Sequence, residues 1–183
     1  MNKRQFLQAG GALVGAIALL RLATQSKSAP SSQPKAANSP DTASQSEVEL
    51  MKANNYEVTK TAEEWRKTLT PEEFDVLRQA KTEPPYSSPL DKLFTAGTYS
   101  CAGCSNPVFS SEAKFDSGTG WPSFYAPLKN AVATTADRSF FMTRTEVHCD
   151  RCGGHLGHVF DDGPKPTGKR YCMNGVAMTF EAA

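Results

Sequence analysis

Two cysteine pairs with the spacing C-x-x-C constrain this chain more than any other feature of its sequence. The pairs are Cys101 with Cys104 and Cys149 with Cys152. Two such turns can present four thiolates at the corners of a tetrahedron, which is the coordination of structural zinc. Two disulfides could use the same residues in an oxidising compartment. Because two C-x-x-C turns are more specific than one, we expect a single structural Zn²⁺ ion, with no ligand position open for catalysis.

The fifth cysteine, Cys172, lies outside both pairs and close in sequence to several reactive side chains. His155, His158 and Asp162 precede it, and Arg170 lies two residues before it. A cysteine nucleophile acts as the thiolate, so it needs a cationic or hydrogen-bonding neighbour to lower a pKa of about 8.5. Arg170 would share a face with Cys172 if this segment is a strand. A simpler reading also remains, since an isolated cysteine is commonly a small buried hydrophobe and both histidines could be core residues or metal ligands.

Residues 1–22 are expected to form an export signal. Lys3 and Arg4 precede an uncharged run from Gln5 to Leu20, which is too short to span a membrane but fits the apolar region of a signal peptide. The run Lys3-Arg-Gln-Phe-Leu7 resembles the twin-arginine motif with Lys as its first residue. We therefore expect an exported protein in the periplasm or an equivalent compartment, tethered to the membrane if the signal is not cleaved.

Residues 23–46 are expected to be a disordered linker, and residues 47–183 a folded domain. The linker has no aromatic residue and no Val, Ile, Leu or Met, so it cannot bury enough apolar surface to offset its chain entropy. The net charge of the whole chain is +1, and its basic excess lies in the first 46 residues. The domain is therefore mildly acidic, which argues against binding to nucleic acid. Nothing in its sequence indicates assembly, so we expect a monomer.

The domain should be mainly β, with small helices at its N-terminus. The runs Thr61-Ala-Glu-Glu64 and Thr70-Pro-Glu-Glu73 each combine a Thr cap with Glu three residues later, which predicts two helix starts. The second helix should end before Pro84-Pro85. Alternating and apolar patterns predict antiparallel strands at 98–101, 107–110, 132–136, 139–148, 155–160 and 171–180. Arg144 and Glu146 share one face of the longest strand.

Three longer motifs resemble the peptide-methionine (R)-S-oxide reductase family. They are Phe115-Asp-Ser-Gly-Thr-Gly-Trp-Pro-Ser-Phe124, then Cys149-Asp-Arg-Cys-Gly-Gly-His-Leu-Gly-His-Val-Phe-Asp-Asp-Gly-Pro164, then Arg170-Tyr-Cys-Met-Asn174. The resemblance covers the chain from about Tyr56 to Phe180. It implies two antiparallel β-sheets with peripheral helices, and oxidised proteins or peptides as substrates.

The resemblance also assigns a reaction to the C-terminal cysteine. Cys172 would attack the sulfoxide sulfur, methionine would leave, and Cys172 would become a sulfenic acid. A general acid must protonate the departing oxygen. The resemblance assigns this role to His158, with assistance from His155, and it implies that Asp162 and Arg170 orient or tune these groups.

Three further residues receive roles from the resemblance, and one position departs from the family. Asn174 would position groups at the site, while Trp121 and Phe124 would enclose the S-methyl group of the substrate. Many relatives carry a second, resolving cysteine where this chain has Thr119. With four cysteines on zinc, no thiol remains to attack an oxidised Cys172. A thioredoxin-like or small-molecule thiol from outside would then complete the cycle.

Two other kinds of protein could carry some of these features. A zinc module without enzymatic activity could use the same fold to bind a protein partner, but it would have no need of Cys172, His158 and Asn174 together. A Cys–His hydrolase would need an orienting side chain and an oxyanion hole, and no motif for these is apparent.

Overall fold

The computed structural model describes residues 56–138 and 143–183. The expected export signal and linker lie outside these residues, as does the start of the domain. Within the described residues, no helix has the length and apolar character needed to cross a membrane.

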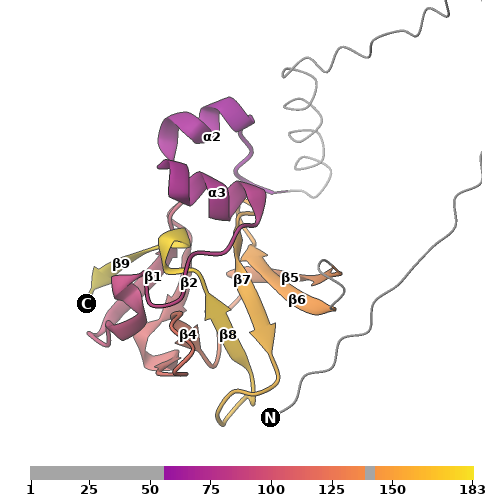
Figure 1. Ribbon diagram of the computed structural model, residues 1–183. Helices are drawn as coiled ribbons and strands as arrows, with labels where there is room; N and C mark the ends of the chain where they lie inside the picture. The colour runs from indigo at the N-terminus through magenta and orange to yellow at the C-terminus, as the bar shows by residue number, and fades with distance from the viewer. Residues whose placement is uncertain (1–55, 139–142) are drawn as a thin grey trace, which may run out of the picture. The chain divides into compact units, whose positions relative to one another are not determined.

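Two short α-helices, α2 (Ala62–Thr68) and α3 (Pro71–Gln79), begin where the sequence predicts. Each starts with a complete capping box, in which the Thr side chain accepts a hydrogen bond from the Glu backbone and the Glu carboxylate accepts one from the Thr backbone. α3 packs against β7 (His155–Phe160) and the 3₁₀ helix η4 (Gly175–Ala177). Figure 1 shows α2 and α3 together at one end of the strands.

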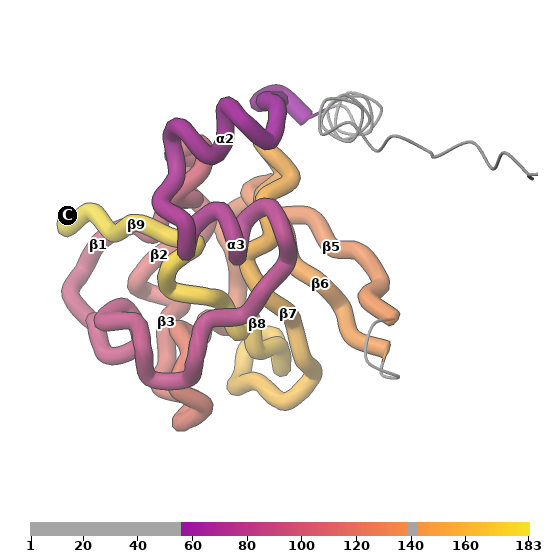
Figure 2. Tube along the Cα trace, turned by 45° about the horizontal axis from the view of Figure 1, so that its top comes forward, coloured from indigo at the N-terminus to yellow at the C-terminus, as the bar shows by residue number. Residues whose placement is uncertain are grey.

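The described strands form two antiparallel sheets, which confirms the expected fold class (Figures 1 and 2). One sheet has the order β2-β1-β9 and the other has the order β3-β4-β8-β7-β6-β5. The strands are β1 (Gly97–Cys101), β2 (Pro107–Ser110), β3 (Lys114–Phe115), β4 (Ser123–Phe124), β5 (Val132–Asp137), β6 (Arg144–Cys149), β7 (His155–Phe160), β8 (Arg170–Met173) and β9 (Met178–Ala182). Single 3₁₀ turns lie at η1 (Pro89–Lys92), η2 (Ser111–Ala113) and η4 (Gly175–Ala177).

The expected single strand over 171–180 is wrong, because the chain changes sheets within it. β8 belongs to the six-stranded sheet and β9 to the three-stranded sheet, with η4 between them. The Glu83 carboxylate accepts hydrogen bonds from the backbone of Gly175 at 2.6 Å and of Val176 at 2.9 Å. These backbone donors are therefore unavailable to a continuous strand. Part of the expected strand at 139–148 lies outside the described residues, and its described part begins at Arg144.

Aromatic side chains from both sheets form the core between them. Tyr99 and Phe109 come from the three-stranded sheet, and Phe124 comes from the six-stranded sheet; all three are fully buried. Phe124 stacks on Phe109 with ring centroids 4.4 Å apart and meets Tyr99 edge-on at 5.0 Å. The Tyr99 hydroxyl satisfies its buried polar end by donating to the Leu93 carbonyl at 2.7 Å. This packing fixes the position of β4, which is the neighbour of the strand that carries Cys172.

Candidate active site and four-cysteine cluster

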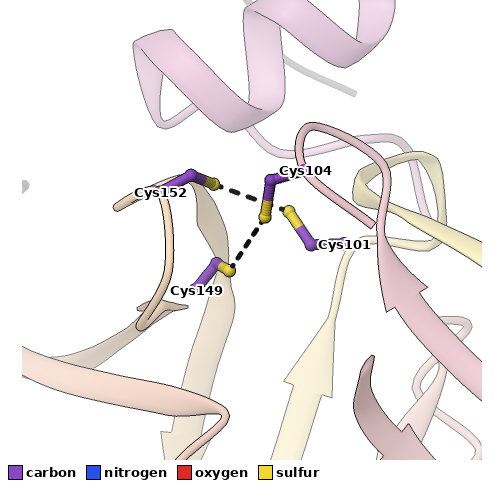
Figure 3. A group of neighbouring side chains, drawn as sticks. All are labelled: Cys101, Cys104, Cys149 and Cys152. Atoms are coloured by element: carbon purple, nitrogen blue, oxygen red, sulfur yellow. Dashed lines mark hydrogen bonds between the residues drawn. The ribbon is translucent and has the colours of Figure 1, made fainter. Parts of the chain in front are cut away.

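The two C-x-x-C turns meet in space and bring four free cysteines together (Figure 3). Cys101 ends β1 and Cys149 ends β6, and the second cysteine of each pair follows in a turn. All four sulfurs lie within 4.8 Å of one another. The Sγ atoms are 3.8 Å apart in the pair Cys101–Cys152 and 3.6 Å apart in the pair Cys104–Cys149. The closest pairs therefore join one turn to the other.

These distances fit a four-thiolate metal site and do not fit two disulfides. A disulfide holds its sulfurs about 2.05 Å apart. Four sulfurs at about 2.3 Å from a central zinc ion lie roughly 3.8 Å from one another. The second turn is also held in a suitable shape, since Gly153 has φ +68° and donates its N–H to the Cys149 carbonyl at 2.8 Å. The cluster is thus a candidate metal site, as expected.

Cys172 lies on β8 at a small pocket of about 150 Å³. In the six-stranded sheet, it pairs with His158 of β7 on one side and with Ser123 of β4 on the other. Antiparallel pairing therefore brings residues together that are distant in sequence. The pocket is lined by Thr82, Trp121, Arg144, Gly157, His158, Phe160, Cys172, Met173 and Asn174.

Opposing effects act on the Cys172 thiol. Burial raises its pKa, whereas hydrogen bonds from Thr119 and Ser123 and the guanidinium of Arg170 lower it, and burial is the largest effect. The Thr119 hydroxyl lies 3.9 Å from Sγ. Arg170 itself is held by two hydrogen bonds to the Asp162 carboxylate, at 2.8 and 2.9 Å. Cys172 is therefore a thiol at neutral pH, with a cation and hydroxyl donors in place for the thiolate.

Each histidine of β7 is bound to a carboxylate from another strand of the same sheet, β6 for His155 and β5 for His158. His155 Nδ1 lies 2.7 Å from Glu146, and His158 Nε2 lies 2.9 Å from Asp137. Asp137 also accepts a hydrogen bond from Arg144 at 2.7 Å. Burial lowers the pKa of His158, although the hydrogen bond with Asp137 opposes this shift. The two imidazole rings meet edge-on with centroids 5.4 Å apart.

The structure brings most of the expected site residues together, with two differences in their contacts. Phe124 is fully buried in the core and does not line the pocket, so it offers no free face to a substrate. Asp162 bonds Arg170, while the histidines are bound by Asp137 and Glu146. Trp121 lines the pocket and donates from Nε1 to the carbonyl of Glu83 at 3.1 Å.

Asn174 is buried next to the pocket and is bonded at both ends of its amide. Its Oδ1 accepts from the backbone of Glu83 at 3.0 Å, and its Nδ2 donates to the Leu156 carbonyl at 3.1 Å. Sequence reasoning missed Glu83, Asp137 and Glu146. The alternation that placed Arg144 and Glu146 on one face of a strand was a signal for Glu146, but it did not indicate which neighbour that face would meet.

A half-buried thiol beside histidine–carboxylate pairs, on two antiparallel sheets joined by a four-cysteine cluster, defines a class of cysteine-dependent enzymes with a candidate structural metal site. The family can be stated from comparison with known proteins. Residues 69–182 match the SelR domain, which is more than half of the chain. The chain therefore belongs to the SelR domain family, that of the MsrB peptide methionine sulfoxide reductases, and the expected resemblance is confirmed.

Similar proteins from distant organisms carry the same description, peptide methionine sulfoxide reductase MsrB. The chain is 52% identical to the protein of Leptospira interrogans over 128 residues, which cover 69% of this chain and 98% of that protein. It is 55% identical to the protein of Methanosarcina barkeri over 125 residues, covering 68% and 88%. It is 56% identical to the protein of Pseudomonas syringae pv. syringae over 120 residues, covering 65% and 92%. The similarity thus spans nearly the full length of these relatives.

Proposed function

We propose that this protein reduces the R epimer of methionine sulfoxide in proteins and peptides, with Cys172 as the nucleophile. The observation that carries the proposal is the position of Cys172 Sγ in a pocket with His158, Trp121 and Asn174, in a chain of the MsrB family. The Cys172 sulfur attacks the sulfoxide sulfur, and the sulfoxide oxygen passes to Cys172. Methionine sulfoxide is reduced to methionine, a thioether, while Cys172 is oxidised to a sulfenic acid, so atoms and electrons balance.

We assign the proton donor to His158. The sulfoxide oxygen gains negative charge as its bond to sulfur weakens, and it must be protonated before methionine leaves. His158 lines the pocket, and Asp137 stabilises the imidazolium form through its hydrogen bond. His155 packs against His158 and is fixed by Glu146, so it assists by orienting the first ring.

The remaining side chains bind the substrate or prepare the nucleophile. Trp121 forms an apolar wall against which the S-methyl group can pack. Arg170, fixed by Asp162, stabilises the Cys172 thiolate by its positive charge. Asn174 positions the end of β8 through its two hydrogen bonds.

We propose that the four-cysteine cluster of Cys101, Cys104, Cys149 and Cys152 holds one structural Zn²⁺. Four thiolates fill a tetrahedral site, so the ion would supply folding energy and no chemistry, typically about 10–16 kcal/mol of apparent binding free energy. The distances between sulfurs support this assignment.

We infer that an external thiol, either a small molecule or a thioredoxin-like protein, reduces the sulfenic acid. The four other cysteines are grouped in the cluster, and Thr119 stands beside Cys172. We also propose that the protein acts as a monomer, because residues of one chain complete the pocket.

We further propose export to the periplasm or an equivalent compartment. The basic and apolar composition of residues 1–22 supports this location, followed by a linker at 23–46 and the catalytic domain at 47–183. A fusion of residues 1–46 to a reporter that is active only after export tests it, and a reporter that stays inactive would contradict it.

Turnover of the two separated epimers with dithiothreitol as the reductant tests the proposed activity. We expect the R epimer to be reduced and the S epimer to be left unchanged. Cys172→Ser should abolish turnover while the fold is retained. Activity in this variant, or turnover of neither epimer by the wild-type protein, would contradict the proposal and favour a non-enzymatic binding module.

A further inference from the structure

A groove of about 810 Å³ lies beside the catalytic pocket. It is formed by the first turns of α3, the segment 81–90, η4 and the start of β9. Thr82 lines both the groove and the catalytic pocket, so the two hollows adjoin at this exposed residue. The larger hollow plays no part in the chemistry assigned to Cys172.

The size of the catalytic pocket requires most of a protein substrate to lie outside it. A cavity of about 150 Å³ can hold benzene, which has six heavy atoms. The side chain of methionine sulfoxide has about as many heavy atoms as benzene, so it would fill the pocket at Cys172. The polypeptide on either side of the oxidised methionine must therefore cross the surface around the pocket.

Glu83 connects the groove rigidly to the catalytic pocket. Its backbone N–H donates to Asn174, its carbonyl accepts from Trp121, and both are residues that line the pocket. Its carboxylate lies on the groove side and accepts from the backbone of Gly175 and Val176. A chain that leaves the pocket across Thr82 thus enters a groove whose floor is fixed relative to the nucleophile.

We propose that this groove binds the polypeptide that flanks the oxidised methionine and favours flanks with apolar and basic side chains. Leu90, Pro84 and Val176 supply apolar surface. The groove is also lined by four carboxylates, those of Glu72, Glu73, Asp75 and Glu83, and by a single cation, Lys81. The Lys81 ammonium is paired with Asp75 at 2.8 Å. The excess of carboxylates complements a basic flank. This inference rests on the proposed function.

Peptide substrates with matched variants test the charge preference. Two nine-residue peptides with a central methionine (R)-sulfoxide carry either lysine or glutamate beside leucine, and N-acetyl-methionine (R)-sulfoxide amide is the short substrate. With dithiothreitol as reductant, the wild-type protein should have a higher kcat/KM for the lysine peptide, and added salt should reduce the preference. Glu72→Lys should lower kcat/KM for this peptide by about three- to tenfold and leave the short substrate unaffected.

Glu63→Lys is the matched control for this charge reversal. Glu63 and Glu72 are both exposed and are both the second residue of a helix that begins with a capping box. The two substitutions therefore carry the same cost at a helix terminus, but only Glu72 lines the groove. An equal loss in both variants would overturn the proposal, because it would show a general effect of surface charge.

A bulky substitution tests occupancy of the groove. Thr179 is exposed and lines the groove from β9, whereas Glu181 is exposed on the same strand outside it. Thr179→Trp should lower kcat/KM for both peptides several-fold, and Glu181→Trp should not. An equal effect of Thr179→Trp on peptides and short substrate, or no effect on the peptides, would overturn the inference. Failure of the wild-type protein on the short substrate would instead contradict the activity itself.

Discussion

Among single residues, several side-chain hydroxyl groups lie around Cys172, the proposed nucleophile. Ser117 Oγ lies 2.8 Å from Thr119 Oγ1 and 2.7 Å from Ser123 Oγ, and Thr119 Oγ1 lies 3.9 Å from Cys172 Sγ. Hydroxyls can donate hydrogen bonds to a thiolate or a sulfenate, but they cannot form a disulfide. The environment thus favours an oxidised Cys172 that persists until an external thiol arrives.

One turnover without reductant should therefore leave Cys172 as a sulfenic acid. We expect a sulfenic acid trap to label Cys172 while the metal is retained, as measured by mass spectrometry. Thr119→Cys should instead give a disulfide with Cys172, if the loop allows a Cα separation of about 4.4–6.8 Å. A disulfide between Cys172 and any cysteine of the cluster, formed during turnover of the wild-type protein, would refute this route.

Replacement of the proposed acid should slow the reaction strongly. We expect His158→Asn to lower kcat by roughly 10²–10⁴-fold, the usual contribution of general acid catalysis. His148→Asn is the control, since His148 is buried but does not line the pocket. Rates that fall equally in both variants, at equal stability, would indicate a structural effect in place of proton transfer.

The pH dependence of kcat/KM should respond to the partner of His158. The proposed mechanism needs the Cys172 thiolate and the His158 imidazolium, and burial raises the pKa of Cys172 and lowers that of His158. Between the two pKa values the thiolate fraction rises as the imidazolium fraction falls, so kcat/KM should stay level. Below the His158 pKa only the thiolate fraction of Cys172 still changes, so kcat/KM decreases as the pH is lowered.

Asp137→Asn removes the carboxylate charge that raises the His158 pKa. The His158 pKa should fall further, and the acidic limb of the profile should move to lower pH. A profile measured from the acid side to above pH 9 checks the direction. An acidic limb that moves to higher pH would show that another group controls it.

Among the strands and helices, strand pairing assembles the candidate site, and one carboxylate binds the turn that follows β8. β4, β8 and β7 set Ser123, Cys172 and His158 side by side. The segment that follows β8 has no strand partner at η4, and Glu83 binds two of its backbone N–H groups. Glu83 therefore positions the turn that follows β8.

Glu83→Gln should weaken this connection. The glutamine amide presents N–H donors where Glu83 presents an acceptor, so one backbone donor of η4 loses its partner. We expect about 1–3 kcal/mol less free energy of unfolding and a lower kcat/KM for short and long substrates alike. Glu63→Gln is the control, because it removes an exposed carboxylate and should change neither the free energy of unfolding nor kcat/KM. Denaturant titration and steady-state assays measure the two quantities. Unchanged stability in Glu83→Gln would contradict the role.

At the scale of the whole molecule, the four-cysteine cluster joins the two sheets. Cys101 ends β1 of the three-stranded sheet, and Cys149 ends β6 of the six-stranded sheet. Arg78 of α3 also donates to the Cys152 carbonyl at 3.1 Å, which ties the helix to the same point. A metal ion here would hold both sheets and α3 in place from one end.

Removal of the metal should therefore destabilise the fold globally. We expect about one zinc per chain by elemental analysis, and we expect Cys104→Ser to lose it and to fold poorly, because the binding free energy is also folding free energy. Cys172→Ser should keep the zinc and the fold. Protein without zinc and with two disulfides by mass would overturn the assignment.

The local features of this protein can be predicted from its amino-acid sequence. Capping boxes at Thr61 and Thr70 specify helix starts through contacts within four residues, and the C-x-x-C spacing indicates two turns that could hold a metal ion. The long motifs around Trp121 and Cys172 were sufficient to indicate the family. These signals are readable because the interacting groups are close in sequence or belong to an uninterrupted motif.

Contacts between side chains on different strands could not be predicted in this way. Asp137 binds His158 and Glu146 binds His155 because β5, β6 and β7 pair in one register. Phe124 belongs to the core, although its motif suggested a substrate contact. Glu83 reaches η4 across about ninety residues of sequence. Such contacts depend on strand register and on the break between β8 and β9, and packing of the whole domain sets both.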